Sequence, residues 1–272
     1  MSVGAGLYVA PFGALADAGA LAAVAARAEA AGWDGLFVWD HVMAAPGVDV
    51  ADPWIALAAV AVATERLRLG PLVTPLPRRR PWDVARQAAT LDRLSGGRAV
   101  LGVGLGGDAF RELSAFGEER DARARAALLD EGLEIVRAAW TGEPVIHAGP
   151  AWTLDRAQVL PTPAQTPAPP LWGACVWPHR APLRRAARLD GVFPVSRATL
   201  EPADVRALLG VVAEHRPADA GPFDVVVSSR RRPDRARLAA LEEAGVTWWL
   251  QGFGDRPALD DVTAAAAAGP PS

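Results

Sequence analysis

The sequence predicts an α/β fold, a closed parallel (β/α)8 barrel of the TIM type. Strand-like and helix-like segments alternate eight times between Val3 and Ala268. The strand-like runs are short and apolar, as expected for strands buried on both faces. The chain has 272 residues, which fits one barrel of the usual size of about 250 residues. We therefore expect a single domain over residues 1–272.

The expected strands alternate with the expected helices along the whole chain. The strands are expected at residues 3–9, 35–39, 69–74, 99–103, 171–174, 192–195, 223–227 and 246–250. The helices are expected at residues 17–31, 53–64, 81–94, 121–140, 181–189, 201–215, 234–244 and 257–268. Asp52 is the expected N-cap of the second helix, because aspartate accepts hydrogen bonds from the first free amides. A Pro-rich insertion, residues 142–170, breaks the alternation between strands four and five and contains a possible short hairpin.

Residues 69–106 are the most informative stretch. Pro81 suits the first position of the third helix, and Gly96 or Gly97 suits its end. Val84, Ala88, Leu91 and Leu94 form its expected apolar face. Glycines then recur at every second position, Gly102, Gly104 and Gly106, where the fourth strand ends. Such a strand end lacks side chains on one face, which predicts close approach of a flat ligand to the backbone.

Composition and charge exclude several classes of protein. The net charge is −3, which argues against a nucleic-acid partner. All 28 basic residues are arginine, so a lysine Schiff-base mechanism is excluded. Cys175 is the single cysteine, the N-terminus lacks a basic signal-peptide region, and the longest apolar run is too short for a bilayer. We expect a cytoplasmic protein without a membrane partner; the oligomeric state is not indicated.

Several motifs occur in order between Gly32 and Pro194. They are GWDGLFVWDHV, DPWIALAAVAVATERLRLG, VTPLPRRRPWDVARQAATLDRLSGGR with VLGVGLG, FGEERDARARAALLDEGLEIVRAAWTGEP and RRAARLDGVFP. Together they resemble the bacterial-luciferase-like family of flavin- and F420-dependent oxidoreductases. The resemblance implies a TIM-type barrel that binds FMN or the deazaflavin F420 at its mouth. Gly102, Gly104 and Gly107 also spell GxGxxG, but a loop-like stretch follows them, which disfavours a Rossmann nucleotide site.

The candidate catalytic residues follow strands two and four, because barrel sites lie at the carboxyl ends of the strands. His41 is the first candidate, since an imidazole can move a proton near neutral pH. The Asp40–His41 pair resembles deazaflavin-dependent members, in which the histidine lies near the reactive edge of the cofactor. In sugar-phosphate-oxidising relatives a glutamate near the strand-four loop is the acid. Asp108 is the candidate for that place, with Glu112 as the other acidic residue of the loop.

The candidate cofactor-binding residues follow strands two to five and seven. They are Asp40, Thr74, Gly104, Gly106, Gly173, Ala174, His179, Arg180 and Arg230. Gly173 and Ala174 stand where the family usually has a glycine pair. His179 and Arg180 begin a helix and can meet a phosphate. Arg230 starts a run of three arginines that can meet a phosphate or a polyanionic tail; a solvated loop is the alternative. The sequence has no metal-binding signature.

The resulting hypothesis is an oxidoreductase that uses noncovalent F420 or reduced flavin for hydride transfer to or from a small organic substrate. We favour F420, on the Asp40–His41 pair and on the Ala- and Arg-rich composition. The alternatives are an FMN-dependent two-component monooxygenase, supplied by a separate flavin reductase, and a flavin-binding protein without turnover.

Overall fold

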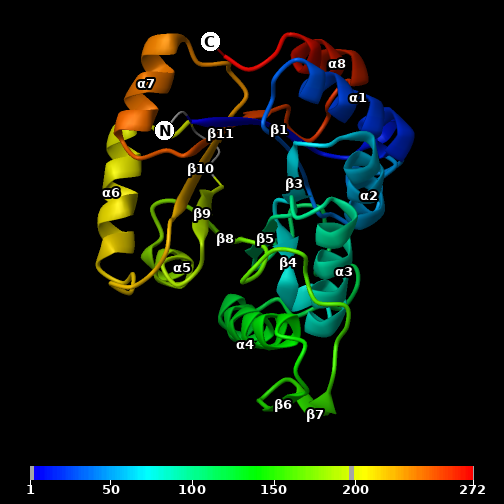
Figure 1. Ribbon diagram of the computed structural model, residues 1–272, viewed down its shortest axis with the longest axis vertical. Helices are drawn as coiled ribbons and strands as arrows, with labels where there is room; N and C mark the ends of the chain where they lie inside the picture. Colours follow the sequence, from blue (N-terminus) through cyan, green and yellow to red (C-terminus); the bar gives the residue numbers. More distant parts are fainter. Residues whose placement is uncertain (1–2, 196–198, 272) are drawn as a thin grey trace.

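The computed structural model describes residues 3–195 and 199–271 and shows a nearly closed barrel of parallel strands surrounded by helices (Figure 1). The strand order is β3-β2-β1-β11-β10-β9-β8-β5-β4. The strands are β1 (Gly4–Val9), β2 (Gly35–Val38), β3 (Arg68–Pro71), β4 (Thr74–Pro75), β5 (Leu101–Gly104), β8 (Leu171–Cys175), β9 (Gly191–Pro194), β10 (Asp224–Ser229) and β11 (Trp248–Gly252). The predicted barrel is confirmed.

The strand expected at residues 69–74 forms as two short pieces, β3 and β4. β3 pairs with β2 on one side, whereas β4 pairs with β5 on the other. Pro71 and Pro75 have no N–H to donate, so a continuous ladder is interrupted there. A single parallel bridge between Leu69 and Ala99 links the two edges and brings the barrel close to closure.

The helices lie outside the strands, within a few residues of the predicted bounds. They are α1 (Ala18–Ala30), α2 (Pro53–Ala63), α3 (Pro81–Leu94), α4 (Ala122–Trp140), α5 (Arg180–Ala186), α6 (Pro202–Ala213), α7 (Arg235–Glu243) and α8 (Leu259–Ala267), with short 3-10 turns η1 (Gly13–Ala16) and η2 (Leu76–Arg78). Asp52 caps α2 as predicted, by accepting hydrogen bonds from Trp54 N and Ile55 N. On α3 the expected apolar face is buried except at Leu94, which is 47% exposed in the last turn.

The core has two layers. Large side chains fill the inside of the barrel, as expected for this architecture: Phe37, Leu72, Val100, Trp172, Phe193, Val226 and Leu250. Trp172 Nε1 donates to Asp224 Oδ2 at 3.1 Å, so this buried indole is satisfied. A larger apolar layer lies between strands and helices. The inner layer closes the barrel below the strand ends and so provides the floor on which a site can form.

Residues 142–170 carry an antiparallel pair, β6 (Val145–Ala148) and β7 (Thr153–Ala157), beyond α4 at the bottom of Figure 1. Buried carboxylates fasten this segment. Glu131 on α4 accepts from the amides of Ala151 and Trp152 and contacts His147 Nε2 at 3.0 Å. Asp92 on α3 likewise accepts from the amides of Ala164 and Gln165. The segment is therefore fixed to the helical layer.

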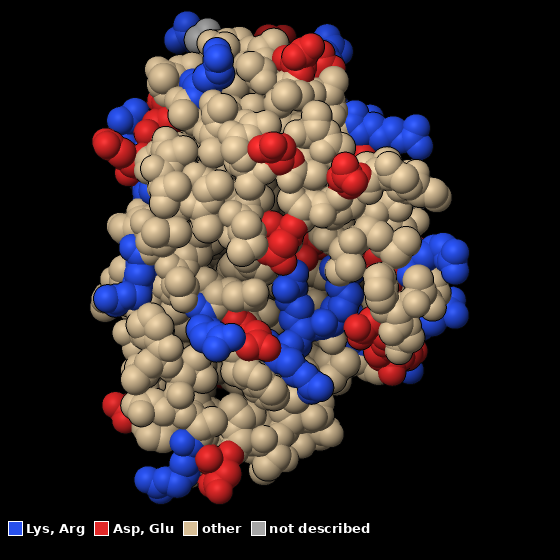
Figure 2. Space-filling view, turned by 90° about the vertical axis from the view of Figure 1, so that its right-hand side faces the viewer, with Lys and Arg blue, Asp and Glu red and all other residues tan. Residues whose placement is uncertain are grey.

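The face that carries helices α1 to α3 is mostly uncharged in the space-filling view, with basic and acidic groups close to one another (Figure 2). Such interspersed charges do not build an extended field of one sign on this face. Among the residues that the structure describes, no helix has the length and apolar character needed to cross a bilayer.

A substitution at Gly70 tests how closely β3 packs against the residues that lead into β5. A Cβ at Gly70 would lie 1.9 Å from the carbonyl oxygen of Val100, so Gly70→Ala must push the two segments apart. Such overpacking against backbone should lower the free energy of unfolding by about 2 kcal/mol or more, measured by urea unfolding. Gly210→Ala is the control, because a Cβ there meets nothing on α6 and should stabilise the helix by about 0.5–1 kcal/mol. Equal stability of Gly70→Ala and the wild type would contradict the packing.

Candidate functional site

A cavity of about 1240 Å³ opens at the carboxyl ends of the barrel strands. Ligand pockets commonly span about 300–1,000 Å³, so this one has room for a large ligand. Its walls come from strands β1, β4, β5, β8, β9, β10 and β11 and from loops that include those after β2 and β3; Tyr8 (β1), Ala174 (β8) and Phe193 (β9) are examples. The position is the one that barrel geometry predicts for a functional site.

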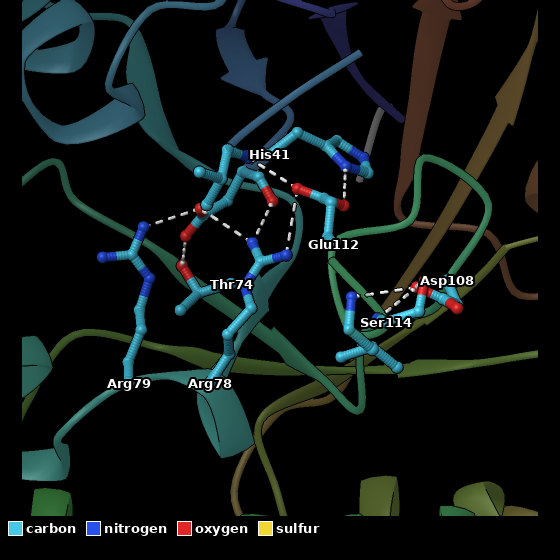
Figure 3. Close-up of polar contacts among 10 residues, drawn as sticks. His41, Thr74, Arg78, Arg79, Asp108, Glu112 and Ser114 are labelled. Carbon is cyan, nitrogen blue, oxygen red and sulfur yellow. Dashed lines mark hydrogen bonds and ion pairs between the residues drawn. The ribbon is translucent and has the colours of Figure 1, made fainter. Parts of the chain in front are cut away.

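The polar centre of the cavity wall is a hydrogen-bonded pair of His41 and Glu112. His41 Nδ1 lies 2.6 Å from Glu112 Oε2, and Val42 N donates to Glu112 Oε1 at 2.6 Å (Figure 3). Arg78 Nη1 approaches the same Oε1 at 3.0 Å. The Glu112 side chain is only 2% exposed, whereas that of His41 is 26% exposed. Because a carboxylate accepts and cannot donate, Nδ1 carries the shared proton and Nε2 remains available to a ligand.

Asp40 organises a second buried network beside this pair. Thr74 Oγ1 donates to Asp40 Oδ2 at 2.9 Å, and Arg79 Nη2 donates to Oδ1 at 2.7 Å (Figure 3). Arg78 Nη2 donates to the carbonyl oxygen of Asp40 at 3.3 Å. The side chains of Asp40 and Arg78 are almost fully buried. The guanidinium of Arg78 thus ties the Asp40 backbone to Glu112, which fixes the loop after β2.

Burial and charge act in opposite directions on Glu112. Burial by itself raises the pKa of a carboxyl. The hydrogen bonds from His41 and Val42 and the charges of His41 and Arg78 lower the pKa of Glu112, and together they outweigh burial. The net result is a pKa below the usual value of glutamate. Glu112 is therefore ionised at neutral pH and keeps accepting from His41.

Aromatic side chains surround His41. Phe110 lies edge-on with 5.1 Å between ring centroids, and Trp39 and Phe12 follow at 5.7 and 5.8 Å. Trp39 Nε1 is buried and has no hydrogen-bond partner among the described residues. Burial raises the pKa of Tyr8, so its phenol on the cavity wall stays protonated. These side chains cover part of the imidazole and leave it 26% exposed.

The structure brings together most of the residues predicted for the site. His41, Asp40, Gly104, Gly106, Ala174, His179 and Arg230 all line the cavity. The cavity lining also contains residues that the sequence did not single out, chiefly Arg78, Tyr8 and Arg123. Arg78 lies in a run of three arginines, residues 78–80, yet its side chain is only 7% exposed. No local sequence pattern distinguishes it from its neighbours.

Four predicted residues lie elsewhere. Thr74 is fully buried, and its hydroxyl donates a hydrogen bond to Asp40 and does not reach the cavity. Gly173 faces α5, where a Cβ would meet Ala186 at 3.0 Å. Arg180 points outward and pairs with Glu214 on the surface. Asp108 does not line the cavity, because its carboxylate accepts hydrogen bonds from the turn that it begins. Their predicted contacts with a ligand therefore need correction.

Close packing of the backbone and side chains also requires the glycine row. A Cβ at Gly102 would lie 2.6 Å from the carbonyl oxygen of Pro71, so this glycine allows close strand packing. At Gly104 a Cβ would lie 3.0 Å from Val73 Cγ2, and at Gly106 it would lie 2.8 Å from Pro75 Cβ. Gly104 and Gly106 do line the cavity. A larger residue there would strain the wall whether or not a ligand is bound.

Fold and site together define the class: a parallel barrel with a large cavity at the carboxyl ends of its strands, beside a buried carboxylate bonded to a histidine. A family model described as luciferase-like monooxygenase matches residues 3–269, so the chain belongs to the luciferase-like monooxygenase family. In the described part of the chain, no group of three or more His, Cys, Asp or Glu side chains is placed to bind a metal.

Individual relatives carry F420 or FMN in their names. The chain is 37% identical over 146 residues to the F420-dependent glucose-6-phosphate dehydrogenase of Amycolatopsis mediterranei (strain U-32), a match that covers 52% of this chain and 43% of that protein. The F420-dependent tetrahydromethanopterin reductase of Methanopyrus kandleri has a similar structure, with a TM-score of 0.77, 18% identity and 99% coverage of both chains. The oxygenating constituent of 3,6-diketocamphane monooxygenase from Pseudomonas putida, solved with FMN, has a TM-score of 0.66 and 20% identity, covering 83% of this chain and 67% of its own. The two structural likenesses support the fold alone.

The lowered pKa of Glu112 predicts how stability changes with acid. A carboxyl with a lowered folded-state pKa stabilises the protein above its unfolded pKa, and this contribution is lost as pH falls through the folded pKa. The difference in free energy of unfolding between the wild type and Glu112→Gln should therefore be largest near about pH 6 and shrink towards about pH 3. Urea titrations across this range measure it. A difference that does not change with pH would contradict the charge assigned to Glu112.

Proposed function

We propose that the chain is an F420-dependent oxidoreductase that transfers hydride between the deazaflavin and a small organic substrate. One observation carries the proposal: the His41–Glu112 pair faces a cavity large enough for such a cofactor at the carboxyl ends of the strands. A pre-oriented histidine with one nitrogen free is suited to proton transfer.

The cavity wall offers matching places for the parts of F420. The small residues Gly104, Gly106 and Ala174 give a smooth wall suited to a flat ring. Arg230 and Arg231 also line the cavity, and neither pairs with a carboxylate in the described part of the chain. The guanidinium of Arg230 lies over Gly254, where a Cβ would be 2.1 Å from Nη2. We assign these two arginines to the anionic tail.

The chemistry that bound F420 supplies is the acceptance and return of a hydride. The proposed task of the protein is to move the accompanying proton. With Nδ1–H held by Glu112, His41 Nε2 has a lone pair and accepts the proton of a substrate hydroxyl when that substrate is oxidised; in the opposite direction it returns the proton. Glu112 stabilises the charge that His41 gains. Phe110 and Trp39 cover part of the imidazole.

F420 is favoured over FMN because several curated relatives are F420-dependent by name, and because two arginines at the cavity lack acidic partners. The FMN-dependent two-component monooxygenase remains the second candidate, because a structural neighbour was solved with FMN. That alternative requires a separate reductase as partner. A flavin-binding protein without turnover is less well supported, since it gives the buried acid–base pair no task.

The cofactor is tested by titrating the purified protein with F420 and with FMN, in oxidised and reduced forms. We expect saturable quenching of F420 fluorescence and weaker binding of FMN. Failure of both cofactors would refute the proposal, and binding of FMN alone would replace it with the monooxygenase alternative.

The arginines at the cavity separate the two cofactors further. Exposed ion pairs contribute about 0–1 kcal/mol each, so the double change Arg230→Ala and Arg231→Ala should weaken F420 binding several-fold and less at high salt. Arg232→Ala is the matched control, because Arg232 does not line the large cavity and lies on a smaller, adjoining one. Equal F420 affinity in the double variant and the control would contradict the assignment of Arg230 and Arg231 to the anionic tail of F420.

His41 should support turnover more than folding. His41→Ala removes the proposed proton carrier and should lower kcat by about 10²-fold or more. Its melting temperature should stay within a few degrees of the wild type, because His41 is partly exposed. His215→Ala, at the end of α6 and outside the cavity lining, is the control and should keep full turnover. Normal turnover of His41→Ala would end its proposed role.

A further inference from the structure

Asp108 begins the turn that brings Glu112 to His41. Its Oδ1 accepts hydrogen bonds from Leu113 N at 2.9 Å, Ser114 N at 3.0 Å and Ser114 Oγ at 3.3 Å. Leu113 and Ser114 directly follow Glu112, so one carboxylate oxygen fixes the backbone on the C-terminal side of Glu112. Figure 3 shows Asp108 and Ser114 close together on the loop that also carries Glu112.

The other side of Glu112 is tied to Asp108 as well. Arg111 N donates to the carbonyl oxygen of Asp108 at 3.0 Å. Arg111 has φ of 62°, in the left-handed region that is unfavourable for a residue with a side chain. Such a conformation persists only where surrounding contacts hold it. The bonds to Asp108 supply these contacts, and they turn the Glu112 side chain inward.

We propose that Asp108 is a positioning residue that holds the turn of residues 108–114 so that the Glu112 carboxylate meets His41 Nδ1. The inference rests on the role proposed above for the His41–Glu112 pair. Asp108 acts through Glu112 and does not line the large cavity. The backbone hydrogen bond from Ser114 is the main cause of its lowered pKa, which keeps the acceptor ionised.

The rival role for Asp108 is that of the acid itself, and two substitutions separate the roles. Asp108→Asn keeps an Oδ1 acceptor at the same distance from the backbone but has no ionisable proton. Asp108→Glu keeps the carboxyl but moves it one methylene further out. Positioning therefore predicts that asparagine rescues the site and glutamate does not. Direct acid catalysis predicts the reverse.

The test reads the tautomer of His41 in the ligand-free protein. Long-range ¹H–¹⁵N correlation spectra of histidine-labelled protein at alkaline pH distinguish Nδ1–H from Nε2–H, and His41→Asn assigns the signal. The wild type and Asp108→Asn should show the Nδ1–H form bonded to Glu112. Asp108→Ala and Asp108→Glu should move towards the Nε2–H form that free imidazole prefers. Ser114→Ala, which removes only the longest of the three bonds, should keep the wild-type signal.

Turnover gives the second readout. Asp108→Ala and Asp108→Glu should lower kcat by about 10-fold to 10²-fold, the scale of a misplaced catalytic group, while Asp108→Asn stays within about threefold. An unchanged tautomer in both the alanine and glutamate variants would overturn the proposal, as would loss of the Nδ1–H form in Asp108→Asn. If Asp108→Ala does not fold, the asparagine and glutamate variants decide. Because the spectra need no cofactor, a failure to bind F420 would refute the proposed function and leave this test intact.

Discussion

The buried carboxylate of Glu112 is the group on which the arrangement of the site depends. A carboxylate that is 2% exposed is stable only when hydrogen bonds and opposite charges offset its lost hydration. His41 and Val42 from the loop after β2 supply two contacts, and Arg78 from η2 supplies the third. Three segments distant in the sequence are thus held at one point. The barrel makes this possible, because β2, β3 with β4, and β5 lie next to one another in the sheet.

The same constraint explains why an arginine stands at position 78. Its Nη1 contacts the Glu112 carboxylate. Its Nη2 donates to the carbonyl oxygen of Asp40 and also lies near the Asp40 carboxylate. A planar guanidinium presents several donors in fixed directions, whereas an ammonium is a single point of charge. A lysine at this position would neutralise one carboxylate and leave the backbone contact unmade. Arg79 completes the charge balance of Asp40.

The barrel was predictable because alternating strands and helices leave a strong periodic pattern, and Asp40 and His41 were predictable because they directly follow a strand. The role of Glu112 was not, since it lies in a loop without periodicity. Its loop has Arg111 in the left-handed conformation and hydrogen bonds from Leu113 N and Ser114 N to Asp108, none of which a residue pattern encodes. Thr74 shows the opposite failure. It is the last residue of the strand predicted at residues 69–74, where a ligand-binding residue would lie, but its hydroxyl holds Asp40.

Charge is distributed unevenly around the cavity. At the end of β2 the carboxylates of Asp40 and Glu112 are matched by Arg78 and Arg79, so this region presents a hydrogen-bonding histidine with little net charge. At the end of β10, three places further round the strand order, Arg230 and Arg231 have no acidic partner in the described chain. A ligand with a neutral ring and an anionic tail would be oriented by this difference, with its tail drawn towards β10 and its ring left near His41. In the proposed function, the electrostatic asymmetry of the cavity therefore directs the reactive part of the cofactor to the one imidazole nitrogen that Glu112 leaves free.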